Sequence, residues 1–143
     1  MLSGAFQIVP DSGGPGTFRG GLGIRRDIRT LQDTVLTTRS EGHSIHPWGI
    51  HGGMAGAPSR VIQHPDTAHE TTLPAKKSNI PLKPGDVVSI RTPGGGGFGP
   101  PEARDRELVR WDVINDLISP ESAARDYGYQ NGTQPMRKGD PIR

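Results

Sequence analysis

Apolar residues occur along the chain in short groups separated by polar or glycine-rich stretches. Residues 24–40 place apolar positions among Thr and Arg, which predicts one or two short strands. Val61 and Ile62 form a short apolar pair, and the polar residues 65–77 that follow predict a connector. Residues 87–92 are rich in β-branched side chains and lie between Pro-Gly turn signals, so they predict the most clearly marked strand.

The pattern changes to a helical period after residue 103. Asp105 can cap a helix whose apolar positions lie three and four residues apart. Ser119 is a suitable N-cap for a second helix, since Pro occupies the next position, and Gly128 is a suitable C-terminal cap. We therefore expect a helical hairpin over residues 104–129, followed by a polar tail over residues 130–143.

The rest of the chain is distinguished by its high content of glycine and proline. The 143 residues include 21 glycines and 14 prolines, whereas Leu, Ile, Val and Phe make up about one fifth. The glycines and prolines gather in three strips, at residues 10–23, 42–58 and 93–101. The predicted body, residues 1–103, is mainly irregular and β, with Gly/Pro-rich polyproline-II-like segments and short strands. It has no large independent core, so part of its packing is expected against another chain.

The glycines of the strips are expected to act in packing and at interfaces, because only a hydrogen atom fits where two backbones approach closely. They are Gly13, Gly14, Gly16, Gly20, Gly21, Gly52, Gly53, Gly94, Gly95, Gly96, Gly97 and Gly99. Three of them match G-x-G-x-x-G after a predicted strand, as in dinucleotide sites. Prolines flank this run on both sides, so no helix can start inside it, and we favour the packing role.

Charge and composition exclude several classes of function. The net charge is +2, with 17 Lys and Arg scattered among 15 Asp and Glu, which does not predict a nucleic-acid groove. No apolar stretch approaches the roughly 20 residues that cross a bilayer, so no membrane association is expected. The absence of cysteine excludes disulfides, thiolate metal sites and a Cys nucleophile, and favours a cytoplasmic location.

The candidate catalytic motifs are individually weak. His43, His46 and His51 lack the fixed spacing of a metal motif, so no metal site or cofactor is expected in this chain. Ser12 does not lie in a G-x-S-x-G elbow, and a turn in which its side chain bonds the backbone is the simpler interpretation. Asp112 lies one helical turn before a second aspartate, and we expect both on the solvated face of their helix.

Several short motifs nevertheless occur in a distinctive order over roughly residues 3–130. They are Asp-Ser-Gly-Gly-Pro-Gly at 11–16, Arg-Gly-Gly at 19–21, His-Pro-Trp-Gly-Ile at 46–50, Gly-Gly at 52–53, Gly-Ala-Pro at 56–58, Leu-Lys-Pro-Gly-Asp at 82–86, Thr-Pro-Gly-Gly-Gly-Gly-Phe-Gly at 92–99, Asp-Val at 112–113, Ser-Pro-Glu-Ser-Ala at 119–123 and Tyr-Gly at 127–128. This combination resembles the C-terminal portion of the much longer hydantoinase B / oxoprolinase B family.

The resemblance implies a subunit of a hetero-oligomeric, ATP-dependent complex. It is similar to the small subunit of the ketone carboxylases, whose reaction joins acetophenone and bicarbonate to give benzoylacetate. By this resemblance, the chain completes the fold of a larger hydantoinase-B-like subunit. ATP, with Mg or Mn, is handled by hydantoinase-A-like partners. Two alternatives remain open: a fragment of an ATP-dependent hydantoinase or 5-oxoprolinase, and a structural or binding module without enzymatic activity.

Five residues pair charge or imidazole with glycine-rich backbone, and they are the candidates for contact with substrate or phosphate. They are Asp11, Arg19, His46, His51 and Arg60.

Overall fold

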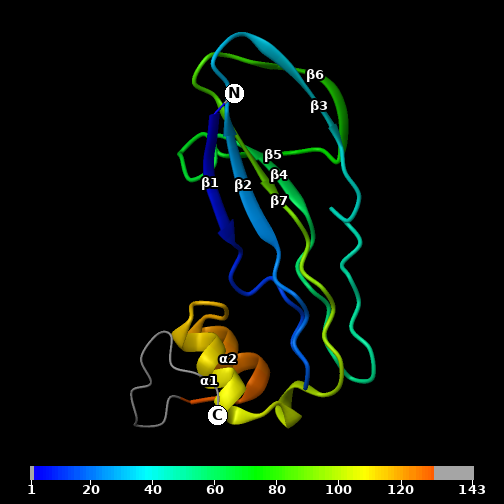
Figure 1. The fold of residues 1–143 in the computed structure, drawn as a ribbon. Helices are drawn as coiled ribbons and strands as arrows, with labels where there is room; N and C mark the ends of the chain where they lie inside the picture. Colours follow the sequence, from blue (N-terminus) through cyan, green and yellow to red (C-terminus); the bar gives the residue numbers. More distant parts are fainter. Residues whose placement is uncertain (1, 131–143) are drawn as a thin grey trace.

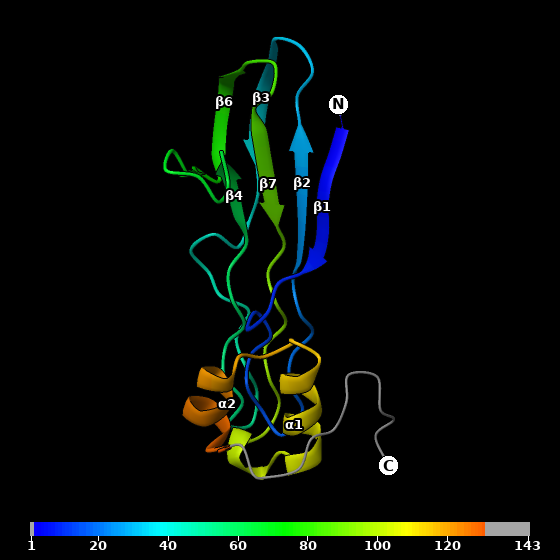
Figure 2. The ribbon, with the colours of Figure 1, turned by 90° about the vertical axis from the view of Figure 1, so that its left-hand side faces the viewer.

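The structure, a computed structural model, describes residues 2–130. A β region occupies one end of an elongated molecule, and long irregular segments continue from its strands toward the other end (Figure 1). Two short helices lie beside these segments, as the rotated view in Figure 2 also shows. The predicted fold class is confirmed: strands and irregular segments dominate, two short helices close the described chain, and there is no large core.

The β region consists of a five-stranded antiparallel sheet and a two-stranded ribbon. The sheet has the order β1 (Leu2–Ile8), β2 (Ile24–Arg29), β7 (Val87–Arg91), β4 (Arg60–Gln63) and β5 (Thr71–Leu73), and the ribbon pairs β3 (Thr34–Arg39) with β6 (Lys76–Leu82). The ribbon packs its apolar side on one part of the sheet. The small core between them is formed by Leu36, Val61, Leu73, Ile80, Leu82 and Val88.

The strand predictions are confirmed in part. Residues 24–40 form β2 and β3, the apolar pair lies in β4, and residues 87–92 contain β7. The prediction that residues 65–77 form a connector is wrong for its second half, because β5 and the start of β6 lie there. These strands carry Thr, Lys and Ser, whose side chains are mostly exposed, so no alternation of apolar positions marks them.

The three glycine strips lie side by side, and each bonds to the other two. Met54 N–H and Ala57 N–H donate to the Pro15 and Ser12 carbonyls at 2.7 and 2.8 Å, and residues 94–98 bond to both of these strips. Gly95 accepts a hydrogen bond from Gly14 N–H and donates one to Gly21, at 2.8 Å each. Gly97 makes the corresponding pair with the other strip: it accepts from Ile50 N–H and donates to Met54, at 2.9 Å each. Residues 94–98 thus bond to both other strips and not to one another, as expected of polyproline-II-like segments, which have no internal hydrogen bonds.

The close approach of these backbones explains why glycine occupies several positions of the strips. A Cβ atom at Gly94 would lie 1.8 Å from the carbonyl oxygen of Ser12, and one at Gly20 would lie 2.0 Å from that of Gly95. Gly96 is equally confined, with a Cβ 1.8 Å from the Trp48 carbonyl oxygen. A Cβ at Gly21, in contrast, would meet no atom within 4 Å. Glycine is therefore required at the contact points and not along the whole strip.

The helical hairpin is confirmed. A 3₁₀ turn, η1 (Pro101–Ala103), precedes α1 (Arg106–Ile114) and α2 (Pro120–Tyr127). The Asp105 carboxylate accepts from Glu107 N–H, the Ser119 hydroxyl accepts from Ser122 N–H at 3.1 Å, and Gly128 ends α2 with φ of +59°. Val109, Ile118, Ala123 and Tyr127 form a second small core. Within residues 2–130 no helix is long and apolar enough to span a bilayer. The predicted tail lies outside the described residues, apart from residue 130.

Candidate functional site

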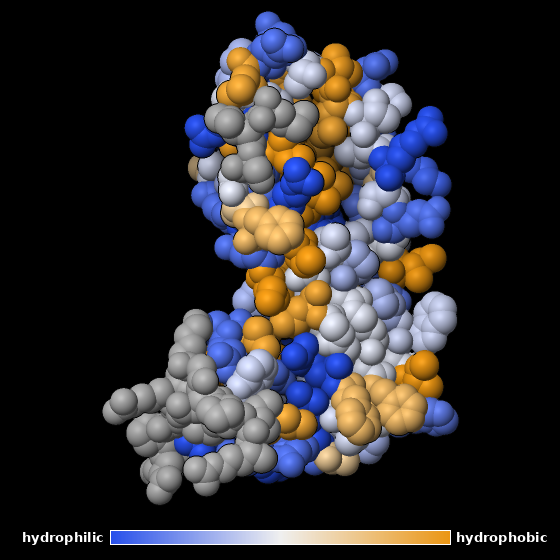
Figure 3. All heavy atoms as spheres, in the orientation of Figure 1, coloured by the Kyte–Doolittle hydropathy of each residue, from blue (hydrophilic) through white to orange (hydrophobic). Residues whose placement is uncertain are grey.

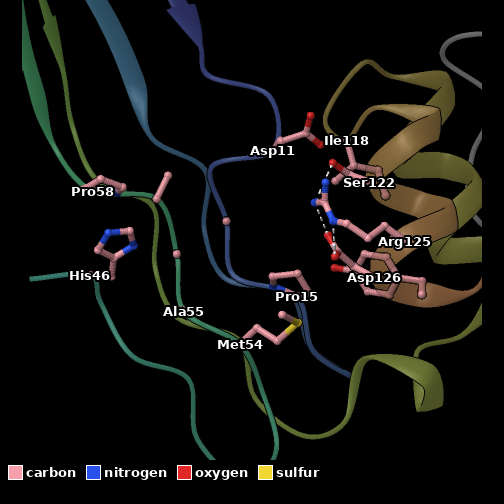
Figure 4. Close-up of a pocket in the computed structure, with 14 residues that line it drawn as sticks. Asp11, Pro15, His46, Met54, Ala55, Pro58, Ile118, Ser122, Arg125 and Asp126 are labelled. Carbon is pink, nitrogen blue, oxygen red and sulfur yellow. Dashed lines mark hydrogen bonds and ion pairs between the residues drawn. The ribbon is translucent and has the colours of Figure 1, made fainter.

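A hollow of about 320 Å³ lies between the glycine strips and α2 (Figure 4). Figure 4 shows His46 and Pro58 on one side, Pro15 and Met54 below, and the side chains of α2 on the other side. Its polar lining consists of Asp11, His46, Ser122, Arg125 and Asp126. Two of the five sequence-predicted candidates, Asp11 and His46, thus line one hollow.

Asp11 connects the first glycine strip to the helix pair. Its Oδ1 accepts a hydrogen bond of 2.8 Å from Ser119 N–H, and its own N–H donates to the Leu117 carbonyl at 3.1 Å. Its φ of +59° lies in the left-handed region, which aspartate tolerates better than most residues. One carboxylate oxygen of Asp11 is therefore occupied in holding the turn between α1 and α2.

The α2 side of the hollow carries a paired charge. Arg125 donates through Nε and Nη2 to the two carboxylate oxygens of Asp126, at 2.7 Å each, and also to the Ser122 hydroxyl at 3.2 Å. The hydrogen bond with Asp126 holds the pKa of Arg125 above its ordinary value, and Asp11 contributes a smaller effect in the same direction. Tyr127 also lines the hollow, and burial raises the pKa of its hydroxyl.

The lining combines the imidazole of His46 with carboxylates and a guanidinium, groups that can bind a small polar molecule. The contribution of α2 to the hollow was not predicted from the sequence. A detectable signal was present, because Ser122, Arg125 and Asp126 are three and four residues apart and so share one face of the predicted helix.

The other three candidates lie elsewhere. Arg19 makes two hydrogen bonds of 3.0 Å to the carboxylate of Asp112. His51, with φ of +51°, is exposed and places its ring edge-on to Phe98, with a centroid distance of 5.1 Å. Arg60 is exposed at the start of β4, opposite Arg91 of β7. The structure therefore does not bring the five candidates together in one site.

The prediction that Asp112 lies on a solvated helix face is wrong. Its side chain is 1% exposed and accepts hydrogen bonds from Arg19 and from Arg104, whose Nη2 lies 2.9 Å away. Position 112 lies three residues after Val109, which is fully buried, so helical geometry places both side chains on the buried side of α1. Asp116 is exposed as expected, but it lies after the end of α1, with φ of +57°, and not on a face of the helix.

The interpretation of Ser12 as a turn residue is confirmed. Its hydroxyl is buried, donates to the Val9 carbonyl at 2.6 Å and accepts from Gly23 N–H at 2.7 Å. Both partners are backbone groups, and none of them is a base that would activate a nucleophile. Among residues 2–130, no group of three or more His, Asp or Glu side chains lies close enough together to hold a metal ion.

Comparison with known proteins relates this chain to much longer ones. The family model for hydantoinase B/oxoprolinase matches residues 1–101. An uncharacterized protein of Methanocaldococcus jannaschii is 42% identical over 85% of the chain, and a putative B-type subunit of a D-/L-hydantoinase from Pseudomonas sp. is 32% identical over 86%. The chain covers 21% of each, so it spans about a fifth of the length of these relatives.

Solved structures agree with this relationship. The ATP-dependent caprolactamase from Pseudomonas jessenii matches 87% of the chain with a TM-score of 0.75 and 28% identity, over 22% of that chain. A nucleotide-free acetone carboxylase structure matches 89% with a TM-score of 0.76 and 22% identity, over 21% of that chain, and shows a common fold. The fold described above is thus shared with these proteins, and the chain belongs to the hydantoinase B/oxoprolinase family.

Proposed function

We propose that this chain forms part of a hydantoinase-B-like subunit in an ATP-dependent enzyme complex, and that its role is to complete the fold of that subunit. The observation that carries the proposal is the distribution of apolar side chains. Among the described residues, 12 large hydrophobic side chains are exposed, whereas the two cores together bury nine hydrophobic residues. Such an excess of exposed apolar groups is typical of a surface that another polypeptide covers.

One group of these side chains lies beside the glycine strips. Phe18 and Phe98, with ring centroids 6.3 Å apart, are both exposed and pair through backbone hydrogen bonds of 2.9 and 3.0 Å. Trp48, Ile50 and Met54 of the neighbouring strip are exposed as well. These five residues are held by the rigid backbone contacts of the strips, which favours a preformed contact surface.

The reaction of the complex has two candidates. The first is carboxylation of a ketone with bicarbonate, as in an acetophenone carboxylase that forms benzoylacetate, and the fold shared with acetone carboxylase supports it. The second is ATP-dependent hydrolysis of a cyclic amide. The identities of 32% to a putative hydantoinase subunit and 28% to caprolactamase favour this second reaction. In both cases ATP is bound by partner chains, including a hydantoinase-A-like subunit.

We also propose that Asp11 and His46 are the residues of this chain nearest to a bound substrate or phosphate, because they line the hollow beside α2. Arg19, His51 and Arg60 act at most indirectly in this proposal. His46→Ala is expected to lower turnover without dissociating the complex, and His64→Ala, at a histidine outside the hollow, serves as the matched control. Equal turnover in both variants would remove His46 from the proposal.

The experiment that tests the function is reconstitution. The chain is produced together with the large hydantoinase-A-like and hydantoinase-B-like polypeptides, and the mass of the native complex gives its composition. ATP consumption is then measured with acetophenone plus bicarbonate, and separately with hydantoin, 5-oxoproline and caprolactam. Benzoylacetate formation supports the carboxylase, and ring opening supports the amide hydrolase. A chain that unfolds cooperatively as a monomer and ignores the large polypeptides would contradict the proposal.

A further inference from the structure

The five-stranded sheet has one apolar face that its own chain covers only in part. Residues paired across an antiparallel sheet share a face, so Phe6 of β1, Arg26 of β2, Ile90 of β7 and Val61 of β4 form one row on that face. Ile8 and Ile24 form the neighbouring row. The face is therefore apolar from edge to centre, with one arginine among the hydrophobic side chains.

The β3–β6 ribbon covers only the β4–β5 side of this face. Val61, Leu73 and Val88 are buried under the ribbon residues Leu36, Ile80 and Leu82. On the other side, over β1, β2 and the end of β7, Phe6 is 72% exposed, Ile8 is 50% exposed, and Ile24 and Ile90 are 40% exposed. Figure 3 shows hydrophobic side chains in orange among the upper strands and down the middle of the molecule. We call Phe6, Ile8, Ile24, Arg26 and Ile90 the open face.

The opposite face of the same strands carries a network of ion pairs. Arg25 makes a bidentate ion pair with Asp27 and a further one with Asp66 of the loop between β4 and β5, while Ser89 is fully buried there. The open face has no such network. Arg26 is exposed, and no hydrogen bond or ion pair joins its side chain to another residue in the part of the chain that the structure describes.

We propose that the open face is the surface that binds the large hydantoinase-B-like polypeptide. That polypeptide adds an apolar layer over β1, β2 and β7 and places a carboxylate against Arg26. This inference rests on the proposed function, since it names the surface by which the chain completes its partner. Two observations select this occupant. The open face continues the core under the ribbon, so a second layer is missing there, and the relatives carry about four fifths of their length outside the matched region.

The test uses the full chain with the large polypeptide, whether that is encoded separately or is the remainder of the same protein. Arg26→Glu places like charge against the expected carboxylate and is expected to weaken the complex by about 100-fold or more, since a mispaired buried charge is costly. Phe6→Asp is expected to have a similar effect. Because both side chains are exposed in the isolated chain, its melting temperature is expected to stay unchanged.

Two matched controls lie on neighbouring surfaces. Arg29→Glu makes the same charge change three residues further along β2, on the opposite face. Val35→Asp introduces a carboxylate on the outer side of β3, where Val35 is exposed. Both are expected to bind like the unaltered chain. If all four variants bind equally well, the open face is not the binding surface. The proposed complex and its activity would not be contradicted by that result.

Other outcomes separate this inference from the proposed function. The open-face variants alone could lose binding while the complex does not use ATP. That result supports the open face as the binding surface and contradicts the proposed ATP-dependent function. A homodimer of the chain alone that Arg26→Glu dissociates would overturn the inference in favour of a second copy. Failure of the unaltered chain to bind the large polypeptide overturns both.

Discussion

The guanidinium of Arg19 and the carboxylate of Asp112, 93 residues apart in the sequence, form a two-point ion pair with both hydrogen bonds at 3.0 Å. Arg104 donates to the same carboxylate at 2.9 Å and also reaches the Thr17 carbonyl. One buried aspartate therefore joins the first glycine strip, the entry to α1 and α1 itself. Bidentate Arg–carboxylate contacts combine charge with fixed geometry, so they hold elements in one orientation.

Asp112→Asn is expected to destabilise the chain by about 3 kcal/mol, because two largely buried guanidinium groups lose their counter-charge. The measurement is the free energy of unfolding in urea, followed by tryptophan fluorescence, since Trp111 adjoins the aspartate. Glu102→Gln, at an exposed acid of η1, is the control and is expected to change stability by less than about 0.5 kcal/mol. Equal stability of both variants would contradict a structural role for the ion pair.

Adjacent glycines offer a sharper comparison. Gly20→Ala is expected to cost about 3 kcal/mol, because its Cβ would lie 2.0 Å from a backbone oxygen that cannot move freely. Gly21→Ala is expected to be neutral or slightly stabilising, since its Cβ meets open space and alanine lowers the entropy of the unfolded chain. Thermal unfolding of the two variants checks this. Similar melting temperatures would show that the strips tolerate a side chain at their contacts.

Ser12→Ala is expected to lower the free energy of unfolding by about 1–3 kcal/mol, because the buried Gly23 N–H and Val9 carbonyl lose their hydroxyl partner. Ser78→Ala, at an exposed serine of β6, is the control. In the reconstituted complex, turnover per folded molecule is expected to stay the same. A variant that is as stable as the unaltered chain but inactive would contradict a purely structural role of Ser12.

Low pH is expected to weaken the ion pair between Arg25 and Asp27 on the polar face of the sheet. The hydrogen bonds from Arg25 hold the pKa of Asp27 below its ordinary value, outweighing the opposite effect of burial. The folded state thus binds fewer protons than the unfolded state, and the stabilisation is fully present above the ordinary aspartate pKa of about 3.9. It is lost as pH falls through the lower pKa of the folded state.

The measurement is a series of urea unfolding curves at pH 7, 5 and 3. The unaltered chain is expected to lose stability mainly below pH 4. Asp27→Asn is expected to be less stable at pH 7 and to lose less between pH 5 and 3. Parallel pH profiles for the two proteins would show that Asp27 does not carry this dependence.

Local chemistry explains which parts of the fold were predictable. Ser119 and Gly128 mark the ends of α2 because capping depends on the side chain at a single position. β7 was predictable because β-branched residues follow a turn signal. β1 contains Gly4 and Ala5 and is an edge strand, so its strand character comes from pairing with β2 and not from its own composition.

The candidate site was less predictable, because its members meet through tertiary contacts. Asp11 and His46 share a hollow only because three strips distant in sequence are bonded together. Arg19 was selected for its charge beside glycine, but its partner Asp112 becomes visible only when α1 is packed against the strip. Composition pointed correctly to close backbone packing, whereas the pairing of individual charges required the fold.

The contacts of residues 94–98 with both other strips have a consequence for synthesis. Residues 12–21 and 47–57 leave the ribosome before this segment, yet most of their backbone hydrogen bonds run to residues 94–99. Such non-local contacts are slow to form and cannot accumulate one at a time. The nascent chain therefore holds two glycine-rich segments with few partners until residue 99 has emerged. Compaction is expected late in translation, when chaperones and the partner polypeptide compete for the same exposed strands.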